Sequence, residues 1–307
     1  MLFEYAVEPK VIGSNWQTFR YLIEKFGFDR GRLISKFPKT WEKEVLEAAV
    51  DFSTMDRARL VESLQRAKQS KFLRSGRPFD RSQGWMANAL TQQDLTPFRA
   101  IVAQENTTGH TSVVVASALD ELEPLMESPH TWQVPRTGAD LAVAMRPLLI
   151  SARTILFVDP YFDVLKTSYR QTLQACLSLV QSSGTKEARC EIHFCPDKYQ
   201  LEFEELERCA TASLRGVVPP GMSVCLYAWS EKFRGEDFHA RNLLTDVGGV
   251  NVESGFSAVG PHQRVQIGLL ATDYAQRQLV AFARTSNVYD LQHPVLEISA
   301  DGTARRI

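Results

Sequence analysis

Residues 236–257, EDFHARNLLTDVGGVNVESGFS, contain the most informative pattern in the chain. Two short apolar runs, at 243–244 and 250–252, favour β-strands. Gly248 and Gly249 stand between them as a turn dipeptide that tolerates positive φ at both positions. The stretch is therefore predicted to be a β-hairpin.

The spacing of the polar residues in the hairpin predicts that two of them share one face of a strand. His239 and Arg241 lie two apart, and residues two apart on a strand project to the same face, so both side chains should point into one site. Asp246 follows Arg241 by an odd number of residues. It can rejoin the other two only from the turn beyond the strand end.

The spacing His-x-basic-x4-Asp resembles the signature of the phospholipase D superfamily, which has Lys where this chain has Arg241. The resemblance implies that His239 attacks a phosphodiester phosphorus and forms a phosphohistidine. It also implies that Arg241 holds a non-bridging oxygen and that Asp246 supports the site from behind. These roles make the three residues candidate catalytic residues.

The family's signature continues with a Gly-Ser pair six residues after the Asp and an Asn three residues after that Ser. Ser254 matches the family's Ser and is the fourth candidate catalytic residue. Glu253 replaces the Gly and Ser257 replaces the Asn, and both are candidate substrate-binding residues. The resemblance covers at most the C-terminal half of the chain.

One copy of the motif supplies a nucleophile but no general acid for the leaving group. In the resembled family two copies face each other, and members with one copy generally build the site from two subunits. The resemblance therefore implies a homodimer and a nuclease-type phosphodiesterase that needs neither metal nor other cofactor. Two alternatives remain: a phospholipase D-like protein that binds nucleic acid or scaffolds a complex without turnover, and an unrelated α/β protein.

Composition limits the location and the partners. The chain has 307 residues, 44% hydrophobic and 23% charged, with a net charge of −1, which is typical of a globular protein and excludes coating of nucleic acid by bulk charge. It has no apolar run of membrane-spanning length and no signal-peptide pattern. Its five cysteines have no metal-ligand spacing. We expect a cytoplasmic protein without a metal site or a membrane partner.

The order of patterns predicts two regions. Residues 1–135 are expected to be a mainly helical region, with two β-segments within 95–118. Residues 136–307 alternate apolar strand patterns, at 155–158, 190–196, 223–229 and 265–271, with helical patterns such as 165–181 and 201–215. This alternation is typical of an α/β fold with helices covering a mixed sheet. Asp159 and Tyr161 follow the first strand, where such sheets place their sites, and are candidate substrate-binding residues. His193, on the next strand, is expected to be a core histidine.

A basic segment at 57–85 has aromatic residues between its cations, a pattern that suits phosphate contacts with base stacking. It can equally be a solvated helix face and loop. The candidate substrate-binding cations in it are Arg66, Lys68, Lys71 and Arg74. This segment favours nucleic acid as the substrate, DNA rather than RNA, and the resemblance to single-motif bacterial members suggests partner proteins of a phage-defence or restriction system.

Overall fold

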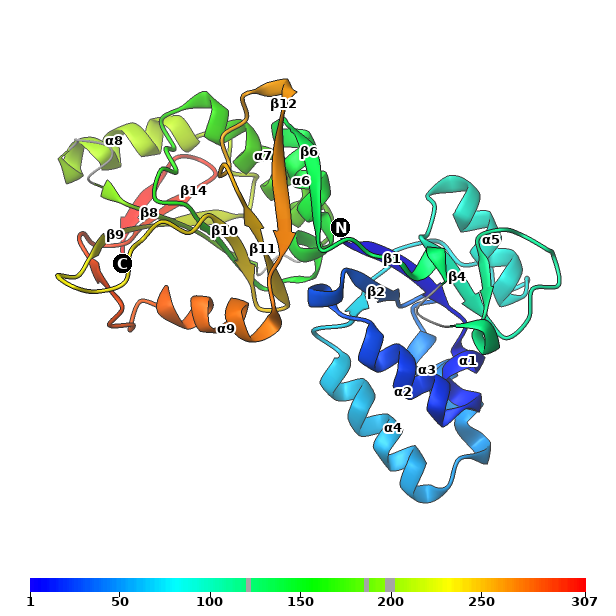
Figure 1. Ribbon diagram of the computed structural model, residues 1–307. Helices are drawn as coiled ribbons and strands as arrows, with labels where there is room; N and C mark the ends of the chain where they lie inside the picture. Colours follow the sequence, from blue (N-terminus) through cyan, green and yellow to red (C-terminus); the bar gives the residue numbers. More distant parts are fainter. Residues whose placement is uncertain (120–122, 185–187, 197–201) are drawn as a thin grey trace. The chain divides into compact units, whose positions relative to one another are not determined.

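The structure is a computed structural model that describes residues 1–119, 123–184, 188–196 and 202–307. It divides into two compact units, Met1–His130 and Thr131–Ile307, each with its own sheet (Figure 1). The boundary precedes the predicted one, after residue 135. The reason is that strand β6, Thr131–Arg136, pairs with β12 in the sheet of the second unit.

The first unit is built on a parallel sheet of five strands in the order β3-β2-β1-β4-β5. The strands are short and mostly buried: β1 Phe3–Val7, β2 Arg32–Ser35, β3 Phe72–Leu73, β4 Ala100–Ala103 and β5 Val113–Val115. The two predicted β-segments correspond to β4 and β5. The other three strands were not expected, because runs of two to five apolar residues have too little periodicity to be told from helix.

Helices surround this sheet: α1 Pro9–Ser14, α2 Trp16–Lys25, α3 Trp41–Ala48, α4 Thr54–Ala67 and α5 Trp85–Leu95. Short 3₁₀ turns occur at Phe28–Arg30, Ala49–Asp51, Ala116–Ala118 and Pro124–Met126. Asn15 and Ser53 cap α2 and α4, as the sequence indicates. The region has more helix than strand, but describing it as mainly helical missed its organising feature, the parallel sheet.

The second unit contains a mixed sheet in the order β15-β14-β9-β8-β7-β10-β11-β12-β6, with β13 paired to β9. The remaining strands are β7 Thr154–Val158, β8 Arg189–Phe194, β9 Ser223–Glu231, β10 Asn242–Thr245, β11 Gly248–Val252, β12 Gly260–Leu269, β13 Tyr289–Leu291, β14 Leu296–Ser299 and β15 Ala304–Arg306. Its helices are α6 Gly138–Ser151, α7 Thr167–Ser182, α8 Phe203–Leu214 and α9 Thr272–Ala281. The predicted α/β class with helices around a mixed sheet is confirmed; residue 201, where one helix was expected to begin, lies outside the described residues.

The two faces of this sheet have separate cores. Leu156 and Val158 of β7 pack in a cluster with Ala275 of α9. The alternate residue Phe157 contacts Phe256 on the other face, where α6 and α7 lie against each other (Figure 1). Because β7 is buried on both faces, its sequence is a continuous apolar run.

Strands β7, β8 and β9 are parallel and joined by α7 and α8, whereas β10 runs antiparallel to β7. The β10–β11 hairpin is present, but its two-residue turn is Asp246-Val247 and not the glycine pair. Gly248 and Gly249 lie in β11, paired with Thr245 and Leu244. Gly249 has a packing reason, since a Cβ there would lie 3.0 Å from the Leu243 carbonyl oxygen and 3.1 Å from the Leu270 side chain.

None of the helices within the described residues is long and apolar enough to cross a membrane.

Candidate active site at the carboxyl end of strand β7

The antiparallel pairing of β7 and β10 brings two distant segments together. Val158, the last residue of β7, pairs with Asn242, the first residue of β10. The next residue on one strand, Asp159, therefore lies opposite the preceding residue on the other, Arg241. The Arg241 Nε atom is 3.7 Å from the Asp159 Oδ1 atom. Two residues that the sequence analysis singled out separately thus form one cluster.

Arg241 is held on three sides. Its Nη1 donates a hydrogen bond of 2.8 Å to the Glu253 carbonyl oxygen, its Nε faces Asp159, and its guanidinium carbon lies 5.1 Å from the centre of the Tyr161 ring. The Nη2 atom has no hydrogen-bond partner among the described residues, and the side chain is 32% exposed. Arg241 therefore keeps one nitrogen, Nη2, that can donate a hydrogen bond to an oxygen atom of a bound molecule.

Asp159 is the fully buried member of the cluster and has no exposed surface. Its Oδ1 accepts a hydrogen bond from the Tyr161 amide (2.9 Å) and its Oδ2 accepts one from the Phe256 amide (3.3 Å). Burial raises the pKa of the Asp159 carboxyl above its ordinary value, and the two amides and the charges of Arg241 and Arg136 only partly oppose this. Asp159 is completely buried and its hydrogen bonds are to backbone amides of the protein, so its predicted contact with substrate stays a prediction.

This carboxyl gives a pH-dependent prediction. Its pKa is higher in the folded chain, so between the ordinary carboxyl pKa of about 3.9 and the raised value the folded state binds more protons than the unfolded state. The contribution of Asp159 to the free energy of unfolding is therefore fully present at low pH, and it falls as pH rises through that interval. In Asp159→Asn this component is absent, so the free energy of unfolding of the variant relative to wild type should rise with pH. Urea unfolding across that interval measures it, and a pH-independent difference would contradict it.

Gly255 belongs to the site and was not predicted. Its φ is +71°, a conformation that favours glycine, and a Cβ there would lie 2.1 Å from the Asp159 Oδ2 atom and 3.1 Å from the Arg241 Cδ atom. A side chain at this position would displace both members of the ion pair. The only sequence signal was a glycine directly after Ser254, in the reverse order of the family's Gly-Ser pair.

Arg136, at the end of β6, was also missed because it lies in no motif. Its Nη2 donates to the Ser254 carbonyl oxygen (2.7 Å) and its Nε to the Ser257 carbonyl oxygen (2.8 Å). The Ser257 hydroxyl bonds the Ser168 hydroxyl of α7 at 3.0 Å. Thus Ser254 and Ser257 lie beside the cluster, and their backbone is fixed by Arg136.

His239 and Glu253 are at the surface. His239 lies in the segment before β10, which begins only at Asn242, so it is not on the strand as predicted. It is exposed and has no hydrogen-bond or ion-pair partner among the described residues. Glu253 is exposed too, and contributes its carbonyl oxygen to Arg241. The His239 imidazole is thus open to solvent, two residues before the held Arg241 in the chain.

Asp246 lies away from the cluster. It occupies the hairpin turn at the opposite end of β10, and its Oδ1 accepts hydrogen bonds from the amides of Arg153 (2.9 Å) and Thr154 (3.1 Å). The pairing of Thr245 with Ile155 sets this position. Asp246 therefore ties the hairpin to the start of β7, at the end of β10 away from Arg241.

The candidate cations of the first unit differ in their contacts. Arg66 pairs with Glu62 at 2.5 Å on α4, and the Lys71 Nζ donates to the Phe26 carbonyl oxygen at 2.6 Å. Burial lowers the pKa of Lys71. Lys68 and Arg74 are exposed and have no ion-pair partner among the described residues. Lys71 is thus used to join two segments of the unit.

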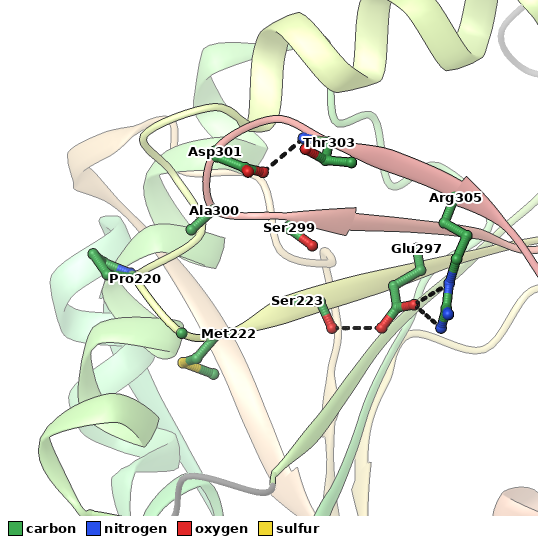
Figure 2. Close-up of a pocket in the computed structure, with 10 residues that line it drawn as sticks. Pro220, Met222, Ser223, Glu297, Ser299, Ala300, Asp301, Thr303 and Arg305 are labelled. Carbon is green, nitrogen blue, oxygen red and sulfur yellow. Dashed lines mark hydrogen bonds and ion pairs between the residues drawn. The ribbon is translucent and has the colours of Figure 1, made fainter.

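A hollow lies beside the start of β9 and the β14–β15 hairpin (Figure 2). Its volume is about 810 Å³, but its polar groups satisfy one another: Glu297 binds Arg305 at 2.7 Å and Ser223 at 2.9 Å. It contains no group with a catalytic arrangement. Within the described residues, no three His, Cys, Asp or Glu side chains are grouped to hold a metal ion.

His193 is a core histidine. It is completely buried, its Nδ1 accepts from the Trp229 indole at 2.8 Å, and its Nε2 faces Glu191 at 3.0 Å. Burial lowers its pKa, which favours the neutral ring. Since Trp229 can only donate, Nε2 carries the proton and donates it to Glu191. The ring is stacked on Tyr227 and closed to substrate.

Two solved structures are similar to the chain. One is Nuc, a phospholipase D family member from Salmonella typhimurium, at 12% identity with a TM-score of 0.32, covering 54% of this chain and 99% of that one. The other is TrmBL2, an archaeal chromatin protein described with a novel mode of DNA binding, at 11% identity with a TM-score of 0.29, covering 79% of this chain and 66% of that one. Both are too distant to assign a function. No protein-family model and no curated protein matches the sequence.

Proposed function

We propose that the second unit is a phospholipase D-like phosphodiesterase, a nuclease that works without a metal ion through a phosphohistidine. The observation that carries the proposal is the cluster at the end of β7. There Asp159 and the Glu253 carbonyl hold Arg241, while its Nη2 stays available and His239 lies two residues away. A guanidinium with a free nitrogen and an exposed imidazole two residues before it in the chain suit a phosphodiester, which needs charge neutralisation and a nucleophile.

The reaction proceeds in two displacements. An imidazole nitrogen of His239 forms a bond to phosphorus, the phosphorus–oxygen bond to the leaving group breaks, and the leaving oxygen takes a proton from a general acid. Water then attacks phosphorus, gives up a proton and releases the imidazole. Arg241 neutralises a non-bridging oxygen during both displacements, when negative charge accumulates there.

The general acid comes from a second copy of the chain in this proposal. Asp159 is buried and cannot reach a leaving group, and His193 is enclosed in the core. A homodimer with twofold symmetry would place one His239 from each subunit in a shared cleft, so that one attacks and the other protonates. Light scattering should give the mass of a dimer; a strictly monomeric protein that still cleaves DNA through His239 would contradict this part of the proposal.

We propose DNA, rather than RNA, as the polymer, and a place beside partner proteins in a bacterial defence or restriction system. The motif and the unpaired cations Lys68 and Arg74 of the first unit support this choice of substrate. The choice of DNA rests on the motif and on charge, and the defence role rests on the resemblance to single-motif bacterial members of the phospholipase D superfamily.

One observation favours a second candidate function, phosphate binding without turnover. Two of the three nitrogens of Arg241 are engaged by protein groups, and His239 has no partner among the described residues that would orient its ring. A site of this kind would bind nucleic acid for recognition or scaffolding.

The test that separates the two candidates measures cleavage and binding together. Labelled single- and double-stranded DNA and RNA are incubated with the protein in EDTA, beside Arg241→Lys. If the protein is a nuclease, wild type cleaves in EDTA and Arg241→Lys loses about 10- to 100-fold in rate, because an ammonium cannot reach Asp159, Glu253 and a phosphate together. Binding without cleavage would support the second candidate, and activity gained in Arg241→Lys would show that Arg241 disables the site.

A further inference from the structure

A pocket of about 300 Å³ in the first unit carries features that the second unit's function does not use. It is formed by two segments, residues 38–40 after β2 and residues 76–81 after β3. Both segments follow the carboxyl ends of adjacent strands in a parallel sheet. This is the edge at which open α/β sheets place their ligands.

The charge of the pocket has one sign. Lys39 and Arg81 line it, both are exposed, and neither has an ion-pair partner among the described residues. No carboxylate is among the lining residues. The carboxylates closest in sequence are engaged: Asp80 accepts from Ser82 and Gln83, Glu42 pairs with Lys36, and Glu44 accepts from Thr40. The charged groups that line the pocket are therefore all cations, and within the part of the chain that the structure describes neither Lys39 nor Arg81 is held in an ion pair.

Backbone donors add to this charge. The amide N–H groups of Lys39, Thr40, Gly76 and Phe79 have no hydrogen-bond partner among the described residues, although all four residues line the pocket. Amide N–H groups without a protein partner, on two loops that line one pocket, can form an anion-binding concavity of the kind that holds phosphates. The φ of Gly76 is +63°, a conformation that favours glycine at the rim.

The floor of the pocket is rigid. The Arg77 guanidinium binds both oxygens of Glu4 on β1, at 3.2 and 2.7 Å, and lies 3.8 Å from the centre of the Phe98 ring. The Ser35 hydroxyl binds the same Glu4 carboxylate at 2.6 Å. This buried ion pair neutralises Arg77 and anchors the backbone of the loop, so less of the loop's conformational freedom is lost when a ligand binds.

We propose that this pocket binds a phosphate group, with Lys39 and Arg81 supplying charge and the loop amides supplying hydrogen bonds. The volume fits one phosphate with a sugar-sized attachment, so the phosphate can belong to a free nucleotide or to the backbone of a nucleic acid. The site lies entirely in the first unit, and it does not depend on cleavage by the second.

The test is calorimetric titration of the full chain carrying His239→Ala, which prevents cleavage, with inorganic phosphate, adenosine monophosphate and a short single-stranded oligonucleotide. At least one probe should bind, and Lys39→Ala with Arg81→Ala should weaken that binding at least about tenfold, the effect of roughly 1.4 kcal/mol. If the double variant weakens the binding of the nucleotide, the ligand is a small molecule. If it weakens only the binding of the oligonucleotide, the ligand is a phosphodiester backbone.

The matched control is the pair Lys43→Ala with Arg20→Ala, which removes the same net charge. Their cations pair with Glu47 (3.4 Å) and Glu24 (2.8 Å), and neither lines the pocket. The control should bind like the parent, and thermal melts should show all variants folded. No binding of any probe, or equal weakening in both pairs, would overturn the proposal. Since cleavage through His239 is assayed separately, failure here leaves the nuclease proposal standing.

Discussion

Replacing His239 with alanine should lower the rate of phosphodiester cleavage at least about 1000-fold and leave the affinity for DNA within about threefold of wild type. The rate falls because the variant has no atom to form the bond to phosphorus. Affinity persists because the phosphate contact of Arg241 is intact and His239 holds no other residue in place within the described structure. Because His239 holds no other residue in place, the variant should melt at the wild-type temperature.

The measurement uses end-labelled DNA in EDTA, with a parallel binding assay. His130→Ala is the matched control, because His130 is an exposed histidine of the first unit outside the proposed site. It should keep the wild-type rate. Quenching the wild-type reaction in alkali should trap phosphate on the protein, and His239→Ala should trap none. Full cleavage by His239→Ala would exclude the phosphohistidine mechanism.

Replacing Gly255 with alanine should lower the free energy of unfolding by about 2–4 kcal/mol, since it combines backbone strain with a clash in the core of the site. The new Cβ would lie 2.1 Å from Asp159 Oδ2, and Asp159 has no free space because it is completely buried. Either the loop 253–257 or the aspartate must move. Arg241 would lose its position in both cases, so cleavage should fall as well.

Gly216→Ala separates the two causes. Gly216 has a φ of +77° in the same unit, but a Cβ there meets nothing within 4 Å, so its substitution should cost only about 1–2 kcal/mol for the backbone. Urea unfolding of both variants measures the difference. In an Asp159→Ala background the extra cost of Gly255→Ala should shrink to that of Gly216→Ala. Equal costs in the wild-type background would mean that the carboxylate contact has no effect.

Local sequence patterns determined a large part of this protein. The hairpin around β10 and β11, the buried strand before Asp159 and the capped starts of α2 and α4 all follow from neighbouring residues. They could be predicted because strand patterns and capping side chains act within a few positions of each other, although the turn of the hairpin lies at Asp246-Val247 and not at the predicted glycine pair. The sequence also singled out Arg241 and Asp159.

Only the tertiary structure decided which of these residues meet. The register between β7 and β10 places Asp159 beside Arg241 and sends Asp246 to the other end of the strand. Arg136 and Gly255 enter the site through contacts over about a hundred residues of sequence, for which no spacing rule exists. The parallel sheet of the first unit was also decided only by the tertiary structure, because each short strand is stabilised by partners far along the chain.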